Sequence, residues 1–482
     1  MKTLALASAG LALAGHRRAY AVAPQAVRAR GRVLVDGRPR AAVGISDGRQ
    51  VVLTDAQGAF QLDTDTTQGF LQVVLPGDVQ VPVSPAGTAA FYRPITPGVA
   101  GAMTAEFRLA TVPGRPDRHT LLLLADPQVQ HAADLARLHA EAVPEMRRVA
   151  RALADRHPVG IACGDIMYDR LEHLGEWERA LRDAGLPGFQ LPGNHDVDIL
   201  ARTDADSTRV FQQRFGPTWY SFDRGDVHII ALDDVLWNLG SFVGHIDRQQ
   251  QEWLAADLAH VEAGRRVLVC VHIPTWCERH LRNGLTAAPD HLVVANRERL
   301  YDLLRPYRAT ILCGHMHELE ILRDGPVDVH VCGAVCGAWW SGDVCGDGTP
   351  NGFMVYDIDG DQLRWRYQAT GRPADHQLRL YAPGADPERP QSVVANVWAH
   401  EPSWQVVWYA DGERRGAMTR HRGLDPRACE LLAGDDRPAG RTWADPLPTD
   451  HLFSCRPDAG VREVTVEATD GWGRVYRERI AV

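Results

Sequence analysis

The sequence contains almost no lysine. Lys2 is the only one, so arginine carries nearly all the positive charge of this 482-residue chain. This absence excludes a phosphate-binding loop that depends on a lysine, and it excludes enzymes that form a Schiff base through lysine. Arginine can still bind phosphate through two parallel hydrogen bonds. Phosphate chemistry therefore remains open to this protein, but not in those two forms.

Long apolar runs and an excess of positive charge are also absent. Neither the short apolar stretch at the N-terminus nor any other run reaches the length of a membrane span. A net charge of −9 argues against a general nucleic-acid-binding protein, so no specific nucleic-acid partner is expected. Residues 1–25 combine one lysine with a short apolar stretch, which predicts an export signal and a periplasmic or secreted protein. The charged run His16-Arg17-Arg18 leaves an ordinary N-terminus and a cytoplasmic protein as the alternative.

The chain has nine cysteines, an odd number. Cys163, Cys270 and Cys313 end apolar runs, where cysteine usually serves as a small buried hydrophobic residue. Cys429 and Cys455 could form a disulfide, and the spacing does not decide whether they do.

The pattern of apolar residues divides the chain into three parts, as its length suggests. Residues 26–112 show short alternating runs broken by Asp-Gly turns, which predicts a small β-sandwich. Residues 117–371 alternate continuous apolar runs with helical spacing, which predicts a layered α/β core whose strands are covered on both faces. Alternating runs return in residues 375–482 and predict a second β-rich domain.

Polar side chains follow all but one of the buried strands predicted in the middle part. The motifs are, in order, Asp126-Pro-Gln128, Gly164-Asp-Ile-Met-Tyr-Asp169, Gly193-Asn-His-Asp196, His272-Ile-Pro274 and Gly314-His-Met-His317; the strand Val227–Leu232 carries none. In an α/β sheet such residues gather at the carboxyl ends of the strands. Oxygen and imidazole ligands without thiolate suit Mn, Fe or Zn.

The order of these five motifs resembles that of the calcineurin-like metallophosphoesterases, over roughly residues 120–370. The flanking β domains resemble a bacterial three-domain branch with a transthyretin-like N-terminal module. The resemblance implies two transition-metal ions, divalent or trivalent. It assigns Asp126, Gln128, Asp165 and His317 to the first ion, and Asn194, His272 and His315, with Asp165 shared, to the second. A shared anionic ligand is what two ions about 3.5–4 Å apart require.

Three further assignments concern substrate and protons. His195 adjoins a ligand without being one, so we expect it to protonate the leaving group or bind a phosphoryl oxygen, with Asp169 as its partner. Tyr168 has the spacing of the iron-binding tyrosine of purple acid phosphatases, and metal binding by it is the minor alternative. Trp339, Trp340 and Trp276 are candidates for a substrate wall, with core packing as the alternative.

The predicted function is hydrolysis of phosphomonoesters or phosphodiesters by attack of a metal-bound hydroxide. The alternative is a surface-binding protein on a degenerate phosphoesterase core that recognises glycan or envelope polymer. The complete ligand set favours the enzyme. The substrate, the native metals and the oligomeric state do not follow from the sequence.

Overall fold

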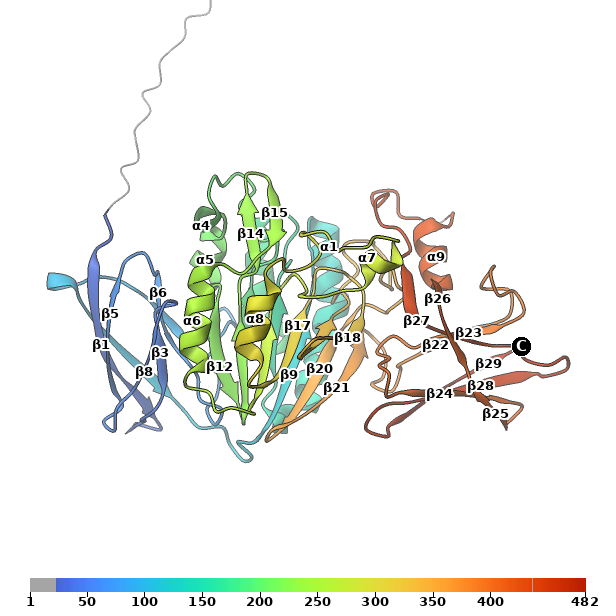
Figure 1. The fold of residues 1–482 in the computed structure, drawn as a ribbon, viewed down its shortest axis with the longest axis horizontal. Helices are drawn as coiled ribbons and strands as arrows, with labels where there is room; N and C mark the ends of the chain where they lie inside the picture. The colour runs from blue at the N-terminus through green and yellow to red at the C-terminus, as the bar shows by residue number, and fades with distance from the viewer. Residues whose placement is uncertain (1–22, 436) are drawn as a thin grey trace, which may run out of the picture.

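A computed structural model of the chain describes residues 23–435 and 437–482. It contains three bodies in a row (Figure 1). The predicted export signal falls mostly on residues outside this description and stays a prediction. No helix within the described ranges is long and apolar enough to cross a membrane. All nine cysteines are described and none is in a disulfide, so Cys429 and Cys455 are not paired.

The N-terminal body is a β-sandwich of two four-stranded sheets, as predicted. Its strands are β1 (Ala26–Val35), β2 (Arg38–Pro39), β5 (Ala59–Asp65) and β8 (Ala102–Leu109) in one sheet, and β3 (Gly44–Ser46), β4 (Val51–Leu53), β6 (Phe70–Val73) and β7 (Tyr92–Pro94) in the other. Residues of β1 alternate between buried and exposed because one face of a sandwich strand meets the core and the other meets solvent.

The central body contains two larger sheets packed face to face. The first has the order β11 (Gly188–Leu191), β10 (Val159–Cys163), β9 (Arg118–Leu124), β20 (Gly352–Asp359) and β21 (Gln362–Ala369). The second has the order β12 (Tyr220–Arg224), β13 (Val227–Ala231), β16 (Arg266–Cys270), β17 (Arg308–Cys313), β19 (Val327–Val331) and β18 (Glu320–Asp324). A hairpin of β14 (Val235–Asn238) and β15 (Ser241–Gly244) projects beside them.

Both faces of these sheets are buried, which explains the continuous apolar runs. Leu121 and Leu123 of β9 pack in the same cluster as Leu268 of the opposite sheet. Leu122 and Leu124 face the other way and pack against helices. The predicted arrangement, a central β-sandwich flanked by helices, is therefore confirmed.

Helices cover the outer face of each sheet. Those beside the first sheet are α1 (Ala132–Arg137), a π-helical turn (Leu138–Ala142), α2 (Val143–Ala152) and α3 (Leu174–Ala184). Those beside the second are α6 (Arg248–Leu258) and α8 (Arg297–Leu304). The shorter helices α4 (Asp204–Ser207), α5 (Arg209–Phe215) and α7 (Arg279–Arg282), and the 3-10 turns Val99–Gly101, Ala154–Arg156 and Leu171–His173, lie in connections.

The C-terminal body is β-rich, as predicted, with two four-stranded antiparallel sheets. They contain β22 (Arg379–Tyr381), β23 (Val393–Asn396), β26 (Thr419–Leu424) and β27 (Pro448–Cys455), and β24 (Gln405–Ala410), β25 (Glu413–Ala417), β28 (Glu463–Thr469) and β29 (Val475–Ala481). One helix, α9 (Pro426–Ala433), begins at Asp425, whose carboxylate accepts the N–H of Ala428. In Figure 1 this body lies against the core beside α7.

Candidate metal centre

The predicted site residues meet where parallel strands of both core sheets end. The first sheet supplies Asp126 and Gln128 after β9, Asp165 and Asp169 after β10, and Asn194 and His195 after β11; the second supplies His272 after β16, and His315 and His317 after β17. The strands β9, β10 and β11 run parallel to one another, as do β16 and β17. Their carboxyl ends therefore bring loops that are far apart in the sequence into one place.

Two groups of side chains converge there closely enough to hold metal ions. Asp165, His272 and His315 form one group, and Asp126, Asp165 and His317 form the other, with the ligand atoms of each group within 4.8 Å of one another. Asp165 belongs to both groups and is almost completely buried. This geometry is what a carboxylate shared between two cations requires.

The protons around His272 leave several lone pairs facing one another. Nδ1 of His272 lies 2.9 Å from the carbonyl oxygen of Cys163, which can only accept, so Nδ1 donates. In the neutral ring Nε2 is then a lone pair. It lies 3.0 Å from Oδ1 of Asn194, 3.1 Å from Nδ1 of His315 and 3.3 Å from Oδ1 of Asp165.

His315 is oriented in the same way. Its Nε2 donates to the carbonyl oxygen of His291 at 2.8 Å, so its Nδ1 is also a lone pair. With both rings neutral, four acceptors face one another, namely Nε2 of His272, Nδ1 of His315 and the oxygens of Asn194 and Asp165. A proton on Nε2 of His272 would satisfy them, and so would a cation, for which imidazole, amide and carboxylate ligands suit Mn, Fe or Zn.

The pKa values reflect this demand for positive charge. Burial alone would lower the pKa of His272, but the charge and hydrogen bond of Asp165 raise it to about 10. Burial would raise the pKa of Asp165, yet His272 and His195 hold it well below its ordinary value. Burial and the neighbouring His272 lower the pKa of His315, which keeps that ring neutral and able to bind metal.

Gln128 also fits the role of a ligand. Its Nε2 donates to Oδ2 of Asp165 at 2.6 Å, and its Oε1 is buried with no hydrogen-bond partner among the described residues. A buried amide oxygen without a partner is uncommon, because its desolvation is not compensated. Gln128 can therefore orient Asp165 with one end of its amide and offer an oxygen to a cation with the other.

His195 is held against the centre by two aspartates. Its backbone N–H donates to Oδ1 of Asp165 at 2.9 Å, and its Nδ1 lies 2.9 Å from Oδ1 of Asp169. Burial would lower the pKa of His195, but Asp165 and Asp169 together raise it. The protonated ring is thus favoured, which suits a proton donor. Tyr168 packs its ring 4.3 Å from that of His195.

Glycines permit the close approach of these loops. A Cβ at Gly193 would lie 2.2 Å from the backbone nitrogen of Asp165, and a Cβ at Gly314 would lie 2.5 Å from Oδ2 of Asp126. Neither position has room for a larger residue. Glycine is therefore required before Asn194 and before His315, because any side chain there would collide with the neighbouring loop.

Two supporting carboxylates were not assigned a role in the sequence. Asp196 accepts the backbone N–H groups of Ile166, Met167 and Gly193 at 2.9–3.0 Å and so joins two of the site loops. Asp234 accepts the N–H of His272 at 3.0 Å. Asp196 stood inside a recognised motif, and Asp234 follows β13, the strand that showed no motif. Burial is the main cause that raises the pKa of each to about 7.

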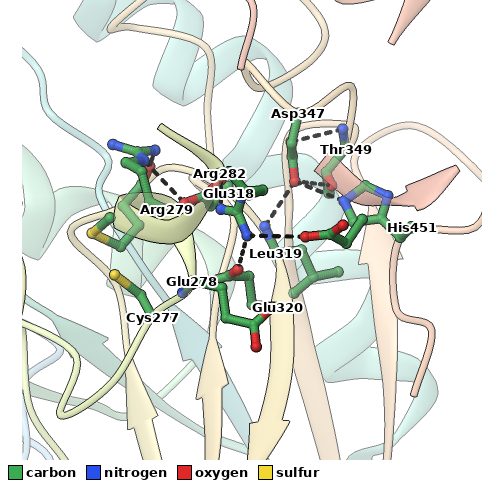
Figure 2. A network of polar contacts seen from close by, with 12 residues as sticks. Cys277, Glu278, Arg279, Arg282, Glu318, Leu319, Glu320, Asp347, Thr349 and His451 are labelled. Atoms are coloured by element: carbon green, nitrogen blue, oxygen red, sulfur yellow. Dashed lines mark hydrogen bonds and ion pairs between the residues drawn. The ribbon is translucent and has the colours of Figure 1, made fainter. Parts of the chain in front are cut away.

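A second polar network holds the segment after His317 (Figure 2). Glu318 pairs with Arg279 at 3.0 Å and with Arg282 at 2.7 Å, both on α7. Leu319 donates its N–H to Oδ2 of Asp347, which also lies 3.2 Å from Nε2 of His451 on β27. The C-terminal body therefore helps to position a loop of the metal centre.

The centre opens into a cavity of about 330 Å³. Trp339 and Trp340 both line it, and Trp340 is also packed in a small apolar cluster. Trp276 does not line it; its ring lies beneath the guanidinium of Arg297 at 5.2 Å and beside His280. The cavity also receives Leu432, Trp443, Ala444, Asp445 and Leu447 from the C-terminal body, which nothing in the sequence indicated.

Family models match both ends of the chain. Residues 27–112 match the model described as N terminal of Calcineurin-like phosphoesterase, and residues 329–476 match that described as C terminal of Calcineurin-like phosphoesterase. Human (Homo sapiens) acid phosphatase type 7 is 23% identical over 227 residues, which cover 41% of this chain and 47% of that protein. The chain thus spans about half the length of this curated relative.

Solved structures that match part of this chain include two phosphatases. A dimetal phosphatase from Danio rerio is 16% identical, with a TM-score of 0.34, and the match covers 52% of this chain and 97% of that one. A purple acid phosphatase from seeds of yellow lupin (Lupinus luteus) is 14% identical, with a TM-score of 0.37, covering 53% of this chain and 52% of that one.

Proposed function

We propose that this chain is a hydrolase of the calcineurin-like phosphoesterase superfamily, which the family models at both of its ends support, and that it cleaves phosphomonoesters or phosphodiesters with two metal ions. The first ion would be held by Asp126, Gln128, Asp165 and His317, and the second by Asn194, His272, His315 and the shared Asp165. The observation that supports this most strongly is the convergence of two groups of potential ligands that share the buried carboxylate of Asp165, with Asn194 and His315 also in contact with Nε2 of His272.

When bound, two such ions would supply positive charge that stabilises the phosphoryl oxygens. They would also lower the pKa of a bound water molecule to near neutrality. The protein would supply the proton for the leaving group. His195 is suited to this because Asp169 and Asp165 stabilise its protonated form. Asp169 would also fix the ring, since it occupies Nδ1 and leaves Nε2 free toward the cavity.

The proposal is tested by elemental analysis and a screen of phosphate esters with Mn, Fe and Zn. We expect close to two ions per chain and hydrolysis of aryl phosphate mono- or diesters. Asp165→Asn should lose both ions and the activity, because the bridging charge is shared. Asp47→Asn provides a matched control, since Asp47 is also a buried carboxylate but accepts turn N–H groups in the N-terminal body.

The outcomes separate the two functions considered. A protein that neither carries nor takes up metal would refute the proposed centre. A protein that binds metal but cleaves none of the esters would favour the surface-binding alternative. Loss of metal in Asp47→Asn would mean that general destabilisation, and not loss of the bridge, explains the Asp165 variant.

A further inference from the structure

The C-terminal body contributes one side of the cavity at the metal centre. Trp443, Leu432, Ala444 and Leu447 reach it from sequence positions more than 90 residues beyond Trp339. We propose that these residues and Trp339, named here the aromatic wall, bind a ring with an apolar face that is carried by the leaving group of the phosphoester. This inference rests on the proposed function and adds the class of substrate.

Trp339 connects the wall to the groups that would carry out hydrolysis. Its ring centroid lies 5.1 Å from that of His317, a candidate ligand, and 6.4 Å from that of His195. On its other side it meets Trp443 at 5.8 Å, with the two ring planes 70° apart. The wall thus begins beside His195, the residue proposed to protonate the departing alcohol, so the group that lies along it is the leaving group.

Trp443 is both exposed and fixed. Its side chain is 46% exposed, so a large aromatic surface faces solvent at the cavity. The guanidinium of Arg441 lies over its ring at 5.4 Å. Arg441 is itself buried and pairs at 2.8 Å with Asp134, a buried residue of α1 in the core. An exposed indole held by a buried ion pair has little conformational freedom to lose when a ligand stacks on it.

Trp340 supports the wall from behind. It lines the cavity but is only 1% exposed, because it packs in a small apolar cluster with Leu432 and Ala444 of the C-terminal body. The cavity of about 330 Å³ is at the small end of ligand sites, which suits a single ring with its phosphate.

The chemistry favours a ring with an apolar face, such as an aryl group, a nucleobase or the C–H face of a sugar. The test compares kcat/KM of phenyl phosphate, a nucleoside 5′-monophosphate and a hexose 1-phosphate with that of ethyl phosphate, which has no ring. Trp443→Ala should lower the preference for at least one ring-bearing ester over ethyl phosphate by about tenfold. Trp443→Phe should keep most of that preference.

Trp472→Ala is a matched control. Trp472 also stands beside another tryptophan, Trp365, and beneath an arginine, Arg474, but it is absent from the cavity lining. Its replacement should leave the ring preference unchanged. A loss confined to the nucleotide would identify a base as the ring, and a loss confined to the hexose phosphate would identify a sugar. An unchanged preference in Trp443→Ala for all three esters would overturn the inference.

Inhibition of the wild-type enzyme gives a second measurement that needs no variant. Phenylphosphonate should inhibit about tenfold more strongly than ethylphosphonate, because only the former can stack on the wall. Equal inhibition by the two would also overturn the inference. Failure of the wild-type protein to hydrolyse any phosphoester with any metal would instead refute the proposed function.

Discussion

The backbone at the metal centre adopts a conformation that most side chains avoid. Six candidate residues have positive φ angles of 43–68°, namely Asp126, Gln128, Asp165, Asp169, His315 and His317. Each such residue costs of order 1–2 kcal/mol relative to ordinary backbone. These strained residues lie where the candidate ligand atoms converge. We infer that the strained backbone orients their side chains toward the site and that the surrounding hydrogen bonds offset its cost.

His195→Ala should reduce turnover without removing the metal. General acid catalysis contributes about 10²–10⁴-fold, and His195 adjoins a proposed ligand without being one. The loss should be large for an alkyl phosphoester, whose alkoxide needs a proton, and smaller for a nitrophenyl ester. Measured kcat values for both esters, with metal content alongside, test this. An equal loss on both esters would instead indicate binding of a phosphoryl oxygen.

Tyr168→Phe should not change the visible spectrum of an iron-loaded sample. A tyrosinate ligand would give a purple charge-transfer band, but the ring of Tyr168 lies against His195 and Trp339. Burial, with Asp169 next in effect, raises the pKa of Tyr168, which opposes ionisation of the phenol. The buried amide oxygen of Gln128 is available to a cation in the same region, so Tyr168 is not needed as a ligand. A visible band in the wild type that disappears in Tyr168→Phe would show that Tyr168 binds iron.

The sequence indicated a site residue only where that residue stands in a recognisable motif. Asn194, His195 and Asp169 stand in short motifs directly after buried strands, so their types and positions pointed to a common site. Asp234 also follows a strand, but its role is a single hydrogen bond to a backbone N–H, which no side-chain pattern encodes. Trp443 reaches the cavity only through the packing of a distant body.

The regular elements were predictable where burial imposed a pattern. The continuous apolar runs of β9, β10, β13 and β16 predict strands correctly, because both faces of these strands are buried. The pairing of β20 with β9 was not foreseen, since the paired residues, from Met354 with Leu123 to Asp359 with Arg118, are far apart in the sequence and leave no local signal. The helical spacing of residues 134–154 predicts one helix, but this segment contains a π-helical turn, because Pro144 lacks the N–H that a regular helix would donate to Ala140.

Helical spacing also predicts a helix from Asp247 to Ala263, whose start is confirmed and whose end is not. At the start the Asp247 carboxylate accepts the N–H of Gln250. The helix ends early, at Leu258, and a turn follows in which Val261 donates its N–H to the carbonyl of Leu258. The hydroxyl of Tyr307 donates to the same carbonyl at 2.9 Å, a contact from far along the chain that no local pattern indicates.

A charged cluster joins β12, β13 and α6 and should make stability depend on pH. Both ring nitrogens of His228 lie 2.8 Å from carboxylates, those of Asp223 and Asp257. Burial would lower the pKa of His228, but Asp257 and then Asp223 raise it to about 10. A raised pKa means that the folded protein binds the proton more tightly than the unfolded chain, whose histidine has a pKa near 6.5.

The contribution of His228 should therefore be complete below about pH 6.5 and should disappear as the pH rises through about 10. At about 1.4 kcal/mol per pKa unit it amounts to a few kcal/mol. Urea unfolding between pH 6 and 10 measures it as the difference in pH slope between wild type and His228→Gln. His260→Gln, at an exposed histidine, is the control. Equal slopes for wild type and His228→Gln would contradict the assignment.

Across the whole molecule, the candidate metal centre lies in the core and is bordered by the C-terminal body. His451 and Arg441 connect the C-terminal body to Asp347 and Asp134 of the core through contacts of 3.2 Å and 2.8 Å. We propose that the domains are residues 26–112, 117–371 and 375–482, with the last acting on the site across this interface. An altered contact there would reach the loop of His317 through Leu319.

Metal binding should stabilise the entire core, since the proposed ligands come from five loops of two sheets that separate when it unfolds. A ligand that binds only the folded state adds about 2.7 kcal/mol at a hundred times its Kd. For a domain of about 250 residues this raises Tm by roughly 5–10 °C. Calorimetry of the chelated and the Mn- or Zn-loaded protein measures the rise, which should grow with the logarithm of metal concentration.

Asp165→Asn should lose this dependence, whereas Asp47→Asn should keep it. A metal-independent Tm in the wild type would mean that the acceptors around His272 are satisfied without a cation.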